Sequence, residues 1–185
     1  MKKDVLKDLT NEKKDNRIEE DLEEHKVLNF IKEVIPYIII LVSVILIRTY
    51  LVTPIIVSGD SMNDTLVNGE LMILNKISEV DRFDIVVVDI KTEKIIKRVI
   101  AMPGESISCE NGIIFVNDKK IETEYGKGTT PDFERVKLAD DEYFVLGDNR
   151  ENSFDSQDFG PIKKSQILGT TKLVLFPFTR IGTVD

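Results

Sequence analysis

Ser61 and Lys97, which are 36 residues apart, are the first candidates for nucleophilic catalysis in this sequence. Ser61 lies in the run "SGDSM", whose small and acidic residues are typical of an exposed turn. A serine hydroxyl attacks a carbonyl carbon only when a base takes its proton. Histidine usually does so, but the single histidine, His25, stands in a charged N-terminal segment. Taken alone, Ser61 is better explained as a turn residue that hydrogen-bonds its own backbone.

Lys97 is the alternative base. It lies in "IIKRVIA", where a strand would place it on the same face as Ile95 and Val99. Burial between apolar neighbours disfavours the ammonium ion and lowers the pKa of a lysine. Lowering that pKa from about 10.4 to about 7–8 requires on the order of 4 kcal/mol, which burial can provide. The competing interpretation is an ordinary lysine that extends from an edge strand into solvent.

A third segment, residues 146–162 ("LGDNRENSFDSQDFGPI"), is dense in side chains that form directed hydrogen bonds. A calcium loop starting at Asp148 is excluded, because its sixth and twelfth positions hold Ser153 and Phe159 where glycine and glutamate are needed. A solvated turn is the other interpretation. The apolar runs on either side, "YFVL" and "FGPI", instead indicate a loop that is fixed onto a core.

The composition narrows the possible chemistry. The formal net charge is −8, with 25 Lys and Arg against 33 Asp and Glu, which disfavours binding to nucleic acid. A single cysteine, Cys109, excludes an internal disulfide and a cysteine-based metal cage. With one histidine as well, a zinc site would have to consist mostly of carboxylates. We therefore expect no metal and no cofactor.

The chain divides by composition into three parts. Residues 1–33, with 8 Lys or Arg and 10 Asp or Glu, are expected to form a charged cytoplasmic segment. Residues 34–52 contain one charge, Arg48, and are long enough for one transmembrane helix, the alternative being a buried core helix. Residues 54–185 are expected to form an extracytoplasmic, mostly β domain.

The charges around the apolar segment predict its orientation. The four Lys and Arg residues nearest before it are Lys14, Arg17, Lys26 and Lys32, and from Thr49 to Leu71 there is none. The positive-inside rule therefore places the N-terminus in the cytoplasm and the β-rich part outside, as a single-pass protein of the cell membrane. A cleaved signal peptide is disfavoured, because "LVTPII" follows with Pro54 and without a small-x-small site.

The β-rich part contains short runs rich in isoleucine and valine, divided by Gly, Asn, Asp and Pro. After residue 60 no helical pattern longer than about two turns stands out. The predicted strands are 70–76, 83–90, 93–101, 112–117, 142–147 and 167–176.

Together, and in this order after one anchor, these segments resemble the type I signal peptidases, which are membrane-anchored serine proteases with a Ser-Lys dyad. The family block S-G-x-S-M-x-P-T-L matches "SGDSMNDTL" at eight of nine positions. The blocks G-D-I-V-V, K-R-V-I-G-x-P-G-D and G-D-N-R-x-N-S-x-D-S-R-x-x-G correspond to "FDIVV", "KRVIAMPGE" and "GDNRENSFDSQDFG". The single anchor and short chain resemble the Gram-positive members. The resemblance implies an antiparallel, barrel-like β-sheet domain behind one transmembrane helix.

The resemblance also implies a role for each matched residue. Ser61 would attack the scissile carbonyl, and Lys97 would take its proton and later protonate the leaving amine. Ser153 would hydrogen-bond the Lys97 amine. The residues that would support the surrounding loop are Asp148, Arg98 and Asp155. The oxyanion hole would include the Ser61 backbone N–H, whereas the serine that some relatives place two residues earlier is Gly59 here.

The implied substrates are signal peptides of secretory preproteins, cut after small residues at −1 and −3. The anchor would hold the active site at the bilayer, near the secretion translocon. By position, the shallow apolar walls of the substrate site are expected from Ile56, Val57, Met62, Leu66, Ile95 and Ile96, with plain core packing as the alternative.

Four residues depart from the family blocks, namely Asp64 for Pro, Phe83 and Ala101 for Gly, and Gln157 for an Arg that would pair with Asp155. None removes a dyad member. Two other functions compete: a self-cleaving Ser-Lys repressor, which the membrane span and the acidic charge disfavour, and a non-catalytic assembly factor for surface structures, which the presence of both dyad residues disfavours.

Overall fold

The chain forms two compact units, Met1–Ile47 and Arg48–Asp185, which are described one at a time. The computed structural model describes residues 28–122 and 124–184. Most of the predicted charged segment 1–33 therefore lies outside the described residues.

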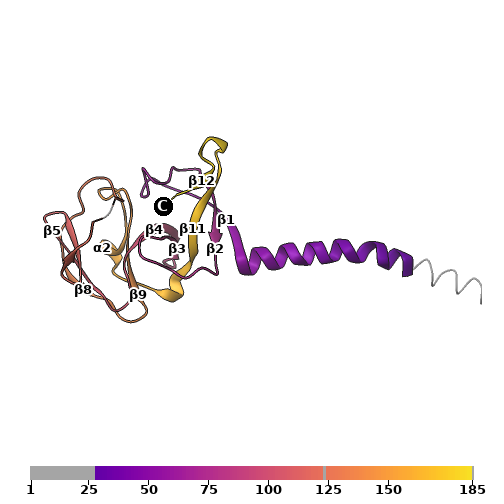
Figure 1. The fold of residues 1–185 in the computed structure, drawn as a ribbon, viewed down its shortest axis with the longest axis horizontal. Helices are drawn as coiled ribbons and strands as arrows, with labels where there is room; N and C mark the ends of the chain where they lie inside the picture. Colours follow the sequence, from indigo (N-terminus) through magenta and orange to yellow (C-terminus); the bar gives the residue numbers. More distant parts are fainter. Residues whose placement is uncertain (1–27, 123, 185) are drawn as a thin grey trace, which may run out of the picture. The chain divides into compact units, whose positions relative to one another are not determined.

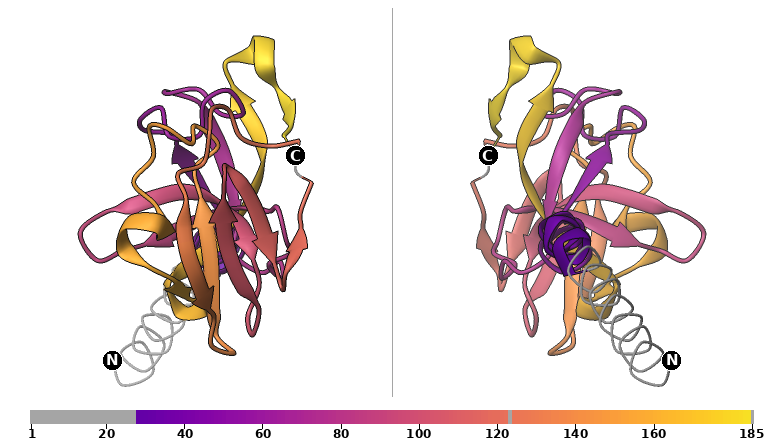
Figure 2. Two further views of the ribbon diagram at one scale, coloured as in Figure 1. Left: turned by 90° about the vertical axis from the view of Figure 1, so that its left-hand side faces the viewer. Right: turned by 90° about the vertical axis from the view of Figure 1, so that its right-hand side faces the viewer.

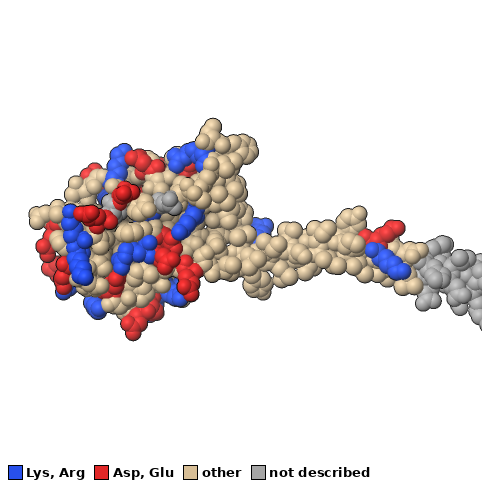
Figure 3. Space-filling model, in the orientation of Figure 1, with Lys and Arg blue, Asp and Glu red and all other residues tan. Residues whose placement is uncertain are grey.

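In the first unit an α-helix covers residues 28–46, and a π-helical turn, η1 (Ile47–Leu51), follows it in the sequence at the boundary between the units. The span Leu28–Leu51 is long and apolar enough to cross a membrane, and none of its most apolar window is buried. On the face drawn in Figure 3, the middle of this helix carries no charged atoms. The predicted transmembrane segment, 34–52, overlaps this span, and its limits stay a prediction.

The second unit is mostly β, as predicted. Its larger sheet has the order β1-β2-β11-β3-β4-β9-β10, with β12 paired to β11, and the smaller sheet has the order β7-β6-β5-β8 (Figure 1). Neighbouring strands in both sheets are antiparallel. The larger sheet consists of β1 (Val52–Ile56), β2 (Leu71–Asn75), β3 (Ile85–Asp89), β4 (Lys94–Ala101), β9 (Glu142–Leu146), β10 (Ile162–Lys163), β11 (Ile167–Phe176) and β12 (Gly182–Thr183). The smaller sheet consists of β5 (Ser106–Glu110), β6 (Ile113–Val116), β7 (Lys119–Lys120) and β8 (Phe133–Lys137).

All six predicted strands are present, and the strands that were missed lack a continuous apolar run. β1 was not among the predicted strands; it contains Pro54, which is tolerated because β1 lies at the edge of the sheet. β8 is an edge strand that carries exposed charges. The short helical elements are α2 (Ser156–Phe159), η2 (Lys164–Gln166) and η3 (Phe178–Arg180). η3 lies in the C-terminal hairpin between β11 and β12, which extends beyond the sheets (Figure 2, yellow).

Three buried clusters hold this unit together. One joins β4 and β9 of the larger sheet to β5 and β6 of the smaller one, and it includes the free thiol of Cys109. The second lies beneath the loop between β1 and β2 and contains Val57, Met62 and Leu66. The third covers the face of β3, β4 and β9 that carries Val86, Val99 and Val145. β4 therefore passes through the centre of the domain and is buried over most of its length.

Candidate active site

Lys97 and Ser61 form a direct hydrogen bond. Lys97 Nζ lies 2.7 Å from Ser61 Oγ. β4 holds the lysine opposite Val86 of β3, and Lys97 is 2% exposed. Its predicted neighbours on the same face, Ile95 and Val99, pack in the third cluster together with Val86. Lys97 is thus buried among apolar side chains and is not a solvated edge lysine.

Burial lowers the pKa of Lys97 below its usual value of 10.5. The negative charges of Asp155, Glu93, Asp148 and Asp158 act in the opposite direction, but desolvation is the largest effect. Once the amine is neutral it has a lone pair, so it can accept the Ser61 hydroxyl proton across the same short contact.

Ser61 is carried by the nucleophile loop, residues 57–70. Hydrogen bonds from Val57 N–H to the Glu70 carbonyl (2.8 Å) and from Gly69 N–H to the Val57 carbonyl (2.9 Å) close this loop at its base. Asn149 holds its tip, because its backbone N–H donates to the Ser61 carbonyl at 3.0 Å and its side-chain amide donates to the Asp60 carbonyl at 3.1 Å. The loop is thus closed at its base and fixed at its tip to the segment after β9.

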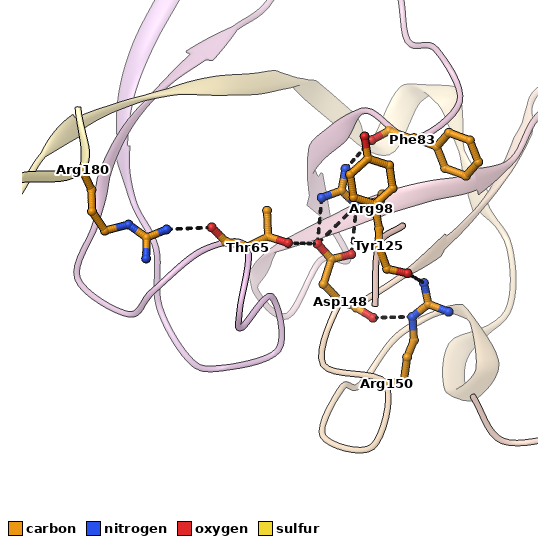
Figure 4. A network of polar contacts seen from close by, with 8 residues as sticks. Thr65, Phe83, Arg98, Tyr125, Asp148, Arg150 and Arg180 are labelled. Carbon is orange, nitrogen blue, oxygen red and sulfur yellow. Dashed lines mark hydrogen bonds and ion pairs between the residues drawn. The ribbon is translucent and has the colours of Figure 1, made fainter. Parts of the chain in front are cut away.

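Arg98, the residue after Lys97, forms a buried ion pair with Asp148 (Figure 4). Arg98 follows Lys97 on β4, so its side chain leaves the opposite face of the strand. Its Nε and Nη2 donate to Asp148 at 2.9 and 2.8 Å, and its Nη1 donates to the Phe83 carbonyl at 2.8 Å. The guanidinium carbon lies 3.7 Å from the centre of the Tyr125 ring. Asp148 also accepts a 2.6 Å hydrogen bond from Thr65 Oγ1, which links this ion pair to the nucleophile loop.

Asp155 organises the chain after β9. It caps α2, and its Oδ2 accepts the Gly147 N–H at 3.0 Å. Gln157, which replaces the arginine of the family block, donates its Nε2 to Asp155 Oδ1 at 3.3 Å. A hydrogen bond from an uncharged amide to the Asp155 carboxylate therefore occupies the place of the implied ion pair.

Ser153 does not form the hydrogen bond to Lys97 that the family resemblance implies. Its Oγ is buried and has no hydrogen-bond partner among the described residues. A side chain added at Gly147 would lie 2.5 Å from the Ser61 carbonyl oxygen and closer still to Ser153 Oγ. Ser153 is therefore packed beside the nucleophile, and the orientation of its hydroxyl towards Lys97 stays a prediction.

The six residues expected to contact substrate occupy different environments. Val57, Met62 and Leu66 are 2%, 2% and 0% exposed, because the nucleophile loop turns them into the second cluster. Ile56 is 68% exposed. The half-buried Ile95 and Ile96 pack against different clusters. Contact between a substrate and any of these residues stays a prediction.

Two departures from the family blocks have visible local consequences. Asp64 forms an exposed ion pair with Lys127 at 3.3 Å. Phe83 has a φ of +70°, a left-handed conformation that glycine adopts without strain. Sequence reasoning also missed the contacts of Tyr125 and Asn149, because neither follows from strand periodicity. Asn149 stands inside the matched "GDNR" block, so its position was a usable signal.

The known proteins that this chain is similar to are signal peptidases. A family model described as signal peptidase, peptidase S26, matches residues 27–176. Signal peptidase I P of Bacillus subtilis subsp. natto is 39% identical over 179 residues, which cover 87% of this chain and 97% of that protein. Signal peptidase I S of Bacillus subtilis (strain 168) is 38% identical over 161 residues, or 78% of this chain and 88% of that protein. The crystal structure of a signal peptidase I from Enterococcus faecalis V583 is 27% identical, with a TM-score of 0.47 over 51% of this chain and 97% of that one.

Proposed function

The chain belongs to the signal peptidase family, peptidase S26, and on this premise we propose that Ser61 and Lys97 are the dyad with which it removes signal peptides from secretory preproteins. The observation that carries the proposal is the 2.7 Å contact between Lys97 Nζ and Ser61 Oγ, made by a lysine that is 2% exposed. A buried amine beside a serine hydroxyl is the arrangement that general-base activation requires.

The reaction proceeds through an acyl-enzyme. Ser61 Oγ attacks the scissile carbonyl carbon while its proton passes to Lys97 Nζ, and the backbone N–H of Ser61 stabilises the oxyanion. The intermediate collapses with cleavage of the C–N bond, and Lys97 gives its proton to the leaving amine, which is the new N-terminus of the mature protein. Water, deprotonated by Lys97, then attacks the ester, which releases the signal peptide as a carboxylic acid and restores Ser61.

The substrate and the location follow from the rest of the chain. We propose that cleavage follows small residues at positions −1 and −3 of the substrate. Ile56, Ile95 and Ile96 are the proposed substrate contacts, because they are exposed or partly buried and a substrate can reach them without a rearrangement of the core. The N-terminal helix would anchor the protein in the cell membrane with its N-terminus in the cytoplasm. The β domain would then meet preproteins on the outer side as they leave the translocon.

The test is cleavage of a purified preprotein by the full-length chain in detergent micelles. Ser61→Ala and Lys97→Arg should both be inactive, the second because a guanidinium does not deprotonate. The matched controls are Ser165→Ala and Lys94→Arg, which change an exposed serine and an exposed lysine of β4 and should cleave like the parent. If Ser61→Ala cleaves as well as the parent, the proposal that this chain is a serine hydrolase is refuted. If Lys97→Arg cleaves as well as the parent, Lys97 is not the general base.

A further inference from the structure

Arg180 reaches the nucleophile loop from the C-terminal hairpin. It is the last residue of η3, and its Nη2 donates to the Thr65 carbonyl at 3.0 Å. Figure 4 shows its side chain extending towards Thr65 from the opposite side to Asp148. Its Nε lies 2.7 Å from Glu70 Oε1, and the two side chains form an ion pair.

The buried carboxylate of Glu70 requires a positive charge beside it, and Arg180 provides that charge. Its side chain is 1% exposed, and its second oxygen accepts the Val67 N–H at 2.9 Å. A carboxylate is costly to bury unless an opposite charge compensates it. Arg180, although its own side chain is 39% exposed, places that charge against Glu70. The ion pair therefore stabilises the C-terminal end of the nucleophile loop.

Thr65 is the point at which two arginine contacts converge. Its hydroxyl donates to Asp148, which holds Arg98, and its carbonyl accepts from Arg180. Thr65 lies four residues after Ser61, in a stretch where the Leu66 N–H also donates to the Met62 carbonyl at 2.8 Å. The part of the loop that follows the nucleophile is thus clamped from the core on one side and from the hairpin on the other.

We propose that Arg180 is a positioning residue for Ser61, acting through Thr65 and Glu70 to hold the nucleophile loop at hydrogen-bond distance from Lys97. The inference rests on the proposed dyad, and it adds a residue beyond position 176, where the match to the family model ends. A displacement of about 1 Å in a reacting group can reduce the rate about 100-fold, so a loop contact remote from the substrate can control turnover.

The proposal predicts a specific kinetic pattern. Arg180→Gln should lower kcat about tenfold and leave KM nearly unchanged, because the clamp positions the nucleophile and does not bind substrate. Arg180→Lys should recover part of kcat, because one ammonium keeps the charge beside Glu70 but lacks the planar fork that contacts two acceptors. A rise in KM with kcat unchanged would overturn the assignment.

The experiment uses the full-length chain in detergent micelles with a purified preprotein, together with hydrogen exchange of peptides covering residues 57–70. Arg135→Gln is the matched control, because it removes an exposed arginine that pairs with Asp118 on the smaller sheet. Arg180→Gln should speed exchange in the loop, and Arg135→Gln should not. Unchanged exchange in Arg180→Gln refutes the clamp. Failure of the parent to cleave refutes the proposed function instead, and the exchange measurement does not depend on cleavage.

Discussion

Replacing Asp148 by asparagine should destabilise the β domain severely. The substitution keeps the size of the side chain but removes the counter-charge of Arg98, whose side chain is 0% exposed while that of Asp148 is 2% exposed. Removing one partner of a buried ion pair costs about 3–5 kcal/mol. The Phe83 carbonyl and the Tyr125 ring still contact the guanidinium, so we expect the lower end, about 3 kcal/mol.

The assay is thermal unfolding of the full-length chain followed by circular dichroism. For a domain of this size, about 3 kcal/mol lowers Tm by roughly 10 °C. Asp64→Asn is the matched control, because both side chains of the Asp64–Lys127 pair are 68% exposed and the pair contributes below about 1 kcal/mol. A double variant, Arg98→Met with Asp148→Asn, should recover part of the loss, because no unpaired charge then stays buried. Equal Tm values for the two single variants would refute the reasoning.

Three further predictions concern the dyad and the residues packed beside it. The cleavage rate should rise with pH through the lowered pKa of Lys97, because only the neutral amine accepts the Ser61 proton; a pH-independent rate would contradict this base. The same shift makes the unfolded chain bind more protons than the folded chain between that pKa and 10.5, so the free energy of unfolding should rise with pH across this window, and Lys97→Met should flatten that rise. Gly147→Ala should lower kcat at least about tenfold, because the added methyl would strike the Ser61 carbonyl oxygen and Ser153 Oγ; parental kcat would show that the loop tolerates the methyl.

The features of this structure that could be predicted are those that follow from a periodic pattern in the sequence. Apolar runs located six strands, and alternation on β4 placed Lys97 between Ile95 and Val99, which is why its burial was predictable. The contacts that bring Tyr125 and Arg180 to the site have no such pattern. Each depends on where a connection between distant strands passes, and that is decided by the packing of the whole domain and not by local periodicity.

The departures at Phe83 and Asp64 also show that local sequence patterns do not reveal contacts between distant segments. Considered alone, each residue is expected to reduce stability. Phe83 has a left-handed φ, which costs about 1–2 kcal/mol in a residue other than glycine. Asp64 lacks the fixed φ that a proline would provide. In the structure both contact the crossing segment, residues 124–130. The Phe83 ring lies 5.6 Å from that of Tyr125, and Asp64 pairs with Lys127.

The crossing segment is itself bound to the loop that carries Asp148. The Lys127 N–H donates to the Asp148 carbonyl at 2.6 Å, and the Arg150 N–H donates to the Lys127 carbonyl at 3.0 Å. Phe83 and Asp64 therefore add a ring contact and an ion pair to one segment that covers the buried Arg98. An aromatic pair contributes about 0.5–1.5 kcal/mol beyond its buried area, which is comparable to the backbone strain at Phe83. Phe83 and Asp64 thus both stabilise the crossing segment, which covers the Arg98–Asp148 pair. A comparison of the family blocks one residue at a time does not show that the two departures contact the same segment.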